Sequence, residues 1–133
     1  MLQRIQNRAA KLVLRLGKYD SCTEALKRLH WLPICKRVEY KIITIVHKCL
    51  FGTAPEYLKC LLKEKNTSYR LRNSDIVNLN IPNCNLVRTE RAFSISGPTL
   101  WNSLPNDLKK CTDFYPFKRK LKTHLFKQYF DNI

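Results

Sequence analysis

The sequence lacks the features that mark a membrane-spanning or secreted protein. No apolar run in its 133 residues approaches the roughly 20 residues that a transmembrane helix needs. The amino terminus has no apolar signal-peptide core, so we expect an intracellular protein, nuclear or cytoplasmic or both. The length suits one compact domain and is too short for a polymerase and an endonuclease together.

The cysteines lack the spacing of a zinc site or of a disulfide framework. There are six, and none forms a C-x-x-C pair. His30 and Cys35 lie close in the sequence, as do His47 and Cys49, but neither pair has a second close-spaced pair to complete a tetrahedral site. We therefore predict reduced thiols, no structural metal and no cofactor.

Acidic residues are scarce and dispersed. The ten Asp and Glu residues are never adjacent, whereas a polymerase holds its two metal ions with clustered carboxylates. The nearest candidate, Tyr19-Asp20, is followed by a serine. The histidines His30, His47 and His124 have no evident nucleophile partner, so we predict packing or surface roles for them. The sequence predicts that this chain is not an enzyme by itself and has no small-molecule substrate.

Positive charge is what the chain has in excess. It carries 25 Lys and Arg against 10 Asp and Glu, a formal charge of +15, and its sequence pI is near 9.8. Such an excess opposes compaction and favours a polyanionic partner. We expect RNA or DNA as that partner, ahead of an anionic membrane.

Apolar periodicity predicts helices in the first half. In residues 2–16 the apolar positions share one helix face, and Gly17 is the expected stop. These positions are Leu2, Ile5, Ala9, Leu12, Val13 and Leu16. That face either packs against the third helix or, where its partner is absent, leaves the helix loosely held. Ser21 and Glu24 form a capping box for a short helix to about residue 29.

Prolines and a glycine punctuate the following segment. Pro33 opens a third helix that Gly52 ends, and Pro55 opens a fourth. Residues 67–97 are rich in Asn, Ser and Thr, and partial alternation at 76–81 and 93–95 indicates a small hairpin or irregular loops. Residues 98–105 indicate a short helix or turn around a tryptophan, stopped by Pro105. Pro116 begins a final helix.

The expected fold class is mainly α. It is a small helical domain with a short irregular or β-hairpin insert. A helical half, residues 1–65, is followed by residues 66–133, which hold the insert and a C-terminal basic helix. That last helix has an apolar ridge formed by Phe117, Leu121, Leu125 and Tyr129. We expect the two halves to form one compact domain.

Basic residues gather on three of the predicted helices. At 100° per residue, the four on the first helix lie within about 60° of one another, with no acid among them. An ordinary solvated face is the alternative, although such faces normally interleave acids. The candidate nucleic-acid-binding residues are Arg4, Arg8, Lys11 and Arg15 on the first helix, Arg37, Lys41 and Lys48 on the third, and Lys118, Arg119 and Lys122 on the last.

The two tryptophans are candidates for stacking on unpaired bases. Trp31 is followed by Leu32-Pro33, and Trp101 is preceded by Leu100. Because of these apolar neighbours, we predict that both are core anchors.

Several phrases occur in a specific order and spacing along nearly the whole chain. They are LQRIQNRAAKLV (2–13), LKRLHWLPICKRVEYKI (26–42), GTAPEYL (52–58), LRNS (71–74), RAFSISGPTLWNSLP (91–105) and FKRKLKTHLF (117–126). Together they resemble the end of the second open reading frame of non-LTR (LINE) retrotransposons of the jockey and chicken-repeat kind.

The resemblance implies a non-catalytic segment that follows the reverse transcriptase in an RNA-directed DNA polymerase and adjoins its thumb. Such a segment would bind the RNA or DNA backbone and support the polymerase during target-primed reverse transcription. A purely structural scaffold docked on the thumb is one alternative, and a fragment adopted by a host for another partner is a second. Since Met1 falls where the family's leading helix is already under way, a truncated gene product or an excised fragment is expected.

Overall fold

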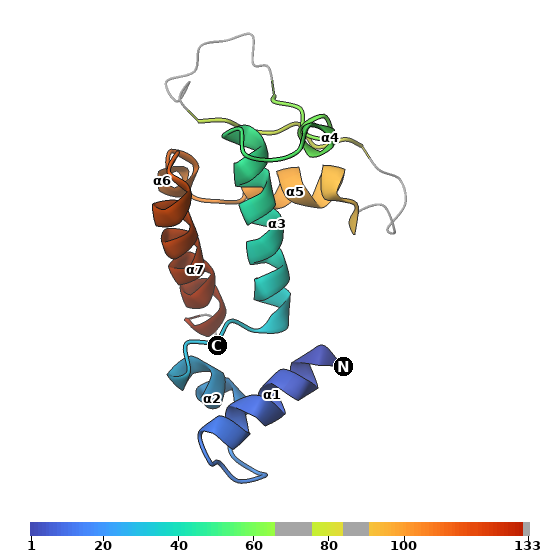
Figure 1. Ribbon diagram of the computed structural model, residues 1–133. Coiled ribbons are helices and arrows are strands. Elements are labelled where there is room, and N and C mark those ends of the chain that lie inside the picture. The colour runs from blue at the N-terminus through green and yellow to red at the C-terminus, as the bar shows by residue number, and fades with distance from the viewer. Residues whose placement is uncertain (66–75, 84–90, 132–133) are drawn as a thin grey trace. The chain divides into compact units, whose positions relative to one another are not determined.

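The computed structural model describes residues 1–65, 76–83 and 91–131, and this part of the chain is mainly helical, as predicted. The described helices are α1 (Leu2–Val13), α2 (Cys22–Arg28), α3 (Ile34–Leu50), α4 (Glu56–Lys59), α5 (Phe93–Asn102), α6 (Asn106–Lys109) and α7 (Phe114–Phe130) (Figure 1). None of these helices is both long and apolar enough to cross a bilayer.

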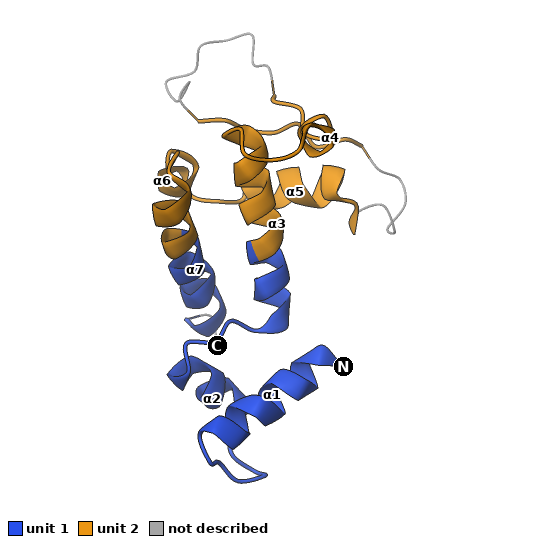
Figure 2. Cartoon of the chain, viewed as in Figure 1, with its two compact units in different colours: residues 1–40, 121–133 blue, residues 41–120 orange. Residues whose placement is uncertain are grey.

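The chain forms two compact units (Figure 2). Unit 1 comprises residues 1–40 and 121–133, and unit 2 comprises residues 41–120. The long helices α3 and α7 therefore contribute to both units. The division predicted near residue 65 rests on composition and stays a prediction.

Helix α1 packs in unit 1 through its polar and small residues. Ala10 is fully buried and belongs to a cluster with Ala25, Leu26 and Phe130. The Gln6 side chain is also buried, and its Nε2 donates to the Leu32 carbonyl at 2.8 Å. The face of α1 that carries Gln6 and Ala10 is thus the one that the rest of unit 1 covers.

The apolar face of α1 is exposed, which is the second of the two alternatives that the sequence left open. Leu2, Ile5, Leu12 and Val13 are 65, 58, 80 and 58 % exposed. Hydrogen bonds made by a neighbouring face of α1 explain this exposure. The first backbone N–H groups of a helix, here α3, have no acceptor within the helix and need one from outside. Gln3 supplies one, its Oε1 accepting from the N–H of the first residue of α3 at 2.9 Å. The hydrogen bonds of Gln3 and Gln6 thus determine which face of α1 packs within unit 1.

Helix α1 also ends before the predicted Gly17. Arg15 has a φ of 53°, and the next residue, Leu16, donates from its N–H to the Lys11 carbonyl at 2.9 Å. This pattern, with Arg15 N–H donating to Leu12 O, is the Schellman motif that usually places glycine at the left-handed position. The chain therefore turns two residues earlier than expected, at a residue whose side chain gives no sign of it.

Helix α2 ends in the same way. His30 has a φ of 51°, and the N–H of Trp31 donates to the Leu26 carbonyl at 2.9 Å. At the start of α2, the serine half of the predicted capping box is confirmed, because Ser21 Oγ accepts from Glu24 N–H at 3.3 Å.

The ends of α3 and the start of α4 confirm the sequence reading. Pro33 immediately precedes α3, and Gly52, with φ 93°, follows it in the left-handed region. Thr53 N–H then donates to the Lys48 carbonyl at 3.0 Å. Pro55 is the N-cap of α4.

Unit 2 is built around Trp101, which is fully buried as predicted. Its indole Nε1 donates to the Val77 carbonyl at 2.9 Å. The neighbouring Asn102 amide both donates to Leu79 O at 2.8 Å and accepts from Leu79 N–H at 2.9 Å. Residues 76–83 have no helix or strand of their own, and these side chains supply the partners that a strand would find in a sheet.

Helix α5 departs from the prediction in its first half. It begins at Phe93, so the predicted alternation at 93–95 belongs to a helix, and it continues through Gly97-Pro98. A Cβ at Gly97 would lie 3.1 Å from Val46 Cγ2, so the missing side chain allows α5 to approach α3 within unit 2. In the described part of the insert, Leu79 forms one isolated antiparallel bridge with Glu64. The other predicted insert residues, 67–75 and 84–90, lie outside the described residues.

Helices α6 and α7 complete the described chain. Helix α6, which has four residues and Pro105 as its N-cap, was not predicted. Helix α7 starts at Phe114, two residues before the predicted Pro116. Its predicted ridge is confirmed, with Phe117 and Leu121 fully buried and Leu125 2 % exposed.

Candidate nucleic-acid interface

Two of the predicted basic residues meet on one aromatic ring in unit 2. Lys48 Nζ, from the last turn of α3, lies 4.9 Å from the centroid of Phe114, and Lys118 Nζ, from α7, lies 5.3 Å from it. Tyr115 contacts the same ring edge-on, with centroids 5.9 Å apart. We call Lys48, Phe114, Tyr115 and Lys118 the Phe114 cluster.

The buried side of the Phe114 cluster is fixed by His47. Its imidazole stacks on Phe117 with centroids 4.1 Å apart and lies 6.0 Å from the ring of Phe114. Its Nε2 lies 2.9 Å from the Cys111 carbonyl, so the neutral ring donates a hydrogen bond there. Burial lowers the pKa of His47, and the hydrogen bond to Cys111 partly opposes that shift. His47 is therefore the packing residue that the sequence predicted.

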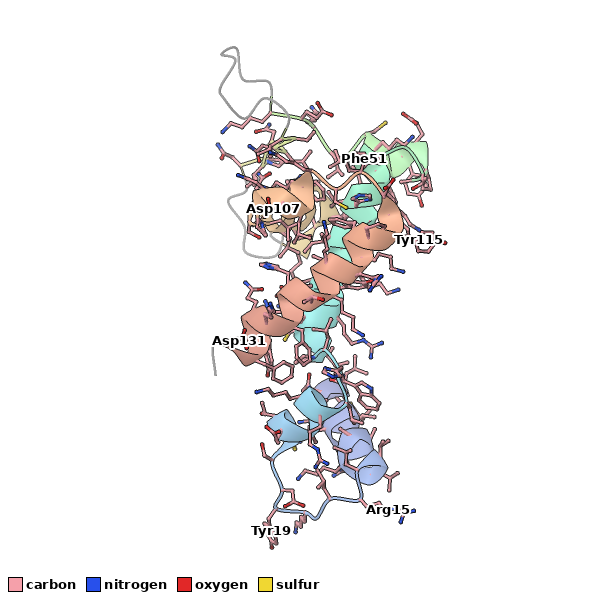
Figure 3. All side chains as sticks on the ribbon, turned by 90° about the vertical axis from the view of Figure 1, so that its left-hand side faces the viewer. Arg15, Tyr19, Phe51, Asp107, Tyr115 and Asp131 are labelled. Atoms are coloured by element: carbon pink, nitrogen blue, oxygen red, sulfur yellow. The ribbon has the colours of Figure 1, made fainter. Side chains whose placement is uncertain are left out.

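The outer side of the cluster is open to solvent. Tyr115 is 79 % exposed, and Figure 3 shows its side chain projecting away from α7. Neither Lys48 nor Lys118 forms an ion pair or hydrogen bond with another described residue. The first turn of α7 adds the positive end of a 17-residue helix. Two unneutralised ammonium groups, a helix amino terminus and an exposed aromatic ring thus lie together.

The four-residue stripe predicted on α1 is shortened. Arg4 and Arg8 are exposed and make no hydrogen bond or ion pair with a described residue. Lys11, however, donates from Nζ to the Lys18 carbonyl at 2.8 Å. Arg15 lies beyond the helix in the left-handed turn, and its side chain projects from the loop (Figure 3).

The other predicted basic residues of the third and last helices lie at exposed positions. Arg37 and Lys41 are exposed on α3, and Arg119 and Lys122 are exposed on α7. Their nucleic-acid contacts stay predictions.

Trp31 is not the core anchor that its neighbours indicated. It is 36 % exposed and lies between α2 and α3, where the left-handed His30 turns the chain. The exposed part of the indole ring is available for stacking on an unpaired base, which is the other role that the sequence allowed for Trp31.

Three residues that matter to this region were missed in the sequence. Tyr115 gave no signal beyond its place beside a basic run. Asn102 supports the fold by pairing with Leu79. Lys109 is only 7 % exposed and donates from Nζ to the Asn102 carbonyl at 2.8 Å. Burial lowers the pKa of Lys109, and its ammonium group is occupied by the hydrogen bond to the end of α5.

The described cysteines Cys22, Cys35, Cys49, Cys60 and Cys111 are free thiols. In the described ranges, no group of three or more His, Cys, Asp or Glu side chains is placed to hold a metal ion.

Comparison of the chain with protein-family models, curated proteins and solved structures gives no match. The resemblance to the LINE tail therefore stays a prediction carried by the quoted phrases.

Proposed function

We propose that this chain is a nucleic-acid-binding module that holds the phosphate backbone of RNA or DNA through the Phe114 cluster. The observation that carries the proposal is the convergence of Lys48 and Lys118, which are 70 positions apart in the sequence, beside the exposed Tyr115. Paired cations next to an exposed ring form the usual site for single strands, where the cations follow the backbone and the ring stacks on a base.

The charge of the whole chain supports the same partner. A net charge of +15 attracts polyanions at long range, and the exposed Arg4, Arg8, Arg37 and Lys41 add to that attraction. The resemblance to non-LTR retrotransposons is consistent with it. On that basis we propose that the module follows a reverse transcriptase, supports it during target-primed reverse transcription, and acts in the nucleus or cytoplasm.

A purely structural role for the two lysines is the alternative. Each ammonium group interacts favourably with the ring of Phe114, which at an exposed site stabilises a fold by about 0.5–1 kcal/mol. Under this alternative the lysines cover an aromatic ring and bind nothing.

Salt dependence of binding separates the two roles. Lys48→Gln combined with Lys118→Gln should reduce the slope of log affinity against log salt by about 1.4 for single-stranded RNA or DNA, at about 0.7 per phosphate contact. Lys63→Gln with Lys65→Gln removes the same charge from exposed positions of the same unit and should leave the slope nearly unchanged. Equal changes in both double variants would mean diffuse attraction by net charge, and the site would be wrong.

Tyr115→Ala tests the stacking step. Loss of a stacked ring costs about 1–3 kcal/mol of binding to single strands, while an exposed substitution changes the free energy of unfolding by less than about 0.5 kcal/mol. Duplex DNA, whose bases are already stacked, should bind this variant as it binds the wild type. A loss of affinity that is the same for duplex and single strand would exclude base stacking.

A further inference from the structure

Helix α1 carries an apolar seam that the described chain leaves uncovered. Leu2, Ile5, Ala9 and Leu12 are spaced by three, four and three residues, which is the a/d spacing of a helix that packs against another helix. The three large side chains are 65, 58 and 80 % exposed. We call these four residues the α1 seam.

The seam cannot be buried by rolling α1 over within unit 1. The adjoining face of the helix is tied down by the hydrogen bonds of Gln3 to Ile34 N–H and of Gln6 to Leu32 O. On the same face, Ala10 is fully buried in the cluster with Ala25 and Leu26. A rotation that covered Leu12 would break both hydrogen bonds, so the seam is available to an occupant from outside the unit.

The charge beside the seam specifies that occupant. With Leu2 and Ala9 as a positions, Arg8 occupies a g position, where partner helices exchange ion pairs. Arg8 is exposed and makes no hydrogen bond or ion pair with a described residue, and α1 contains no acid at all. A helix that fits must therefore bring its own carboxylates to this edge.

A second copy of the chain does not meet that requirement. Two antiparallel α1 helices would bring Arg8 of one copy against Arg8 of the other, and in parallel helices Arg8 would face Val13, an uncharged e position. Two chains of charge +15 also repel one another.

A bilayer surface is the competing occupant, because the exposed apolar residues of α1, with Val13 included, span about 100° and basic residues lie beside them. A helix is favoured by the regular a/d spacing and by the place of Arg8 at a g position, neither of which a lipid surface requires.

We propose that the α1 seam docks an amphipathic helix of a protein partner whose own apolar seam is flanked by Asp or Glu facing Arg8. Twelve residues of α1 extend about 18 Å, so the matching segment is about three turns long. This inference goes beyond nucleic-acid binding and uses none of the residues of the Phe114 cluster.

Synthetic helical peptides of about two heptads test the proposal against the full chain. One peptide has Leu at a and d and Glu at e and g, a second has Lys at e and g, and a third keeps the composition of the first but scrambles the seam. Fluorescence anisotropy should show saturable binding of the first peptide and at least about tenfold weaker binding of the other two. Equal binding of the scrambled peptide would mean charge attraction alone and would overturn the proposal, as would no binding of the first.

Variants locate the binding. Ile5→Gln with Leu12→Gln should weaken the Glu peptide by at least about tenfold with helix content retained, whereas Tyr57→Gln with Leu61→Gln, also exposed apolar positions, should not. Arg8→Glu should shift the preference toward the Lys peptide. Lys48→Gln with Lys118→Gln should leave peptide binding unchanged, which keeps this result separate from the test of nucleic-acid binding.

Two further outcomes would overturn the proposal in favour of another occupant. Concentration-dependent dimerisation that Ile5→Gln with Leu12→Gln abolishes would assign the seam to a second copy. Binding to phosphatidylserine-containing vesicles, abolished by the same change while the Glu peptide fails to bind the wild type, would assign it to a membrane surface.

Discussion

Helices α1 and α7 each have a predicted apolar face in the sequence, and the two faces have opposite fates in the structure. In α7 the ridge of Phe117, Leu121 and Leu125 is buried. In α1 the apolar face is exposed, and the buried residues are Gln6 and Ala10. A 3.6-residue period therefore identifies an apolar face without indicating whether that face is the one that becomes covered. In α1 the hydrogen bonds of the glutamines decide the orientation.

Mutation of the buried α7 ridge should destabilise the fold most. Phe117→Ala removes a fully buried ring that stacks on His47, and truncation of such a residue costs about 3–5 kcal/mol of unfolding free energy. Urea unfolding followed by circular dichroism measures it. A cost below about 1 kcal/mol would mean that the α7 ridge is as weakly packed as the α1 seam.

Asn102→Ala should have the next largest effect. It deletes the amide that pairs with both backbone groups of Leu79, and each buried group left without a partner costs about 1–3 kcal/mol. Asn102→Asp keeps the acceptor for Leu79 N–H but replaces the donor to Leu79 O by a second acceptor oxygen, which repels that carbonyl. Urea unfolding should therefore show both variants to be less stable than the wild type.

A pH change leaves every side chain in place, and we expect a smaller loss from it. The pKa of His47 is lowered in the folded state by burial, so the unfolded state binds more protons as the pH falls. This contribution to stability is fully present above the unfolded pKa of about 6.5 and declines as the pH falls from there toward the lowered value.

Thermal unfolding between pH 8 and pH 5 should show this decline, and His47→Phe should make it less steep. A decline of unchanged steepness in the variant would assign the pH dependence to other groups.

The smallest effect is expected on the α1 seam. Leu12→Ala should change the unfolding free energy of the isolated chain by less than about 0.5 kcal/mol, because the side chain is 80 % exposed. Ala10→Leu, on the covered face of the same helix, should cost about 1–3 kcal/mol by overpacking. A loss of about 2 kcal/mol or more for Leu12→Ala would show that the seam is covered in solution.

The sequence predicted those elements whose ends have a chemical signal. Pro33 and Gly52 bracket α3, and Ser21 caps α2. It placed the end of α2 correctly near residue 29 but missed the end of α1, because Arg15 occupies the left-handed turn in place of glycine. Helix α5 was misjudged at its start because Gly97-Pro98 normally interrupts a helix, whereas here the glycine serves close packing on Val46.

The candidate site was predictable residue by residue and not as an arrangement. Lys48 and Lys118 were both selected for their charge, but their meeting over Phe114 depends on the packing of His47 against Phe117. Helical periodicity reports neighbours within one helix and gives no information on contacts between helices. Tyr115 was missed for the same reason. It is a candidate only because Lys48 and Lys118 lie over the ring of the adjacent Phe114.

The two tryptophans divide between the two units, Trp31 in unit 1 and Trp101 in unit 2. Each unit therefore carries its own optical reporter. Trp31→Phe leaves emission from a fully buried indole, and Trp101→Phe leaves emission from one that is 36 % exposed and accessible to a soluble quencher. Coincident emission transitions in the two variants, after allowance for any stability change, would mean that the units unfold as one cooperative system. Separate transitions would mean that one unit keeps its structure while the other is lost.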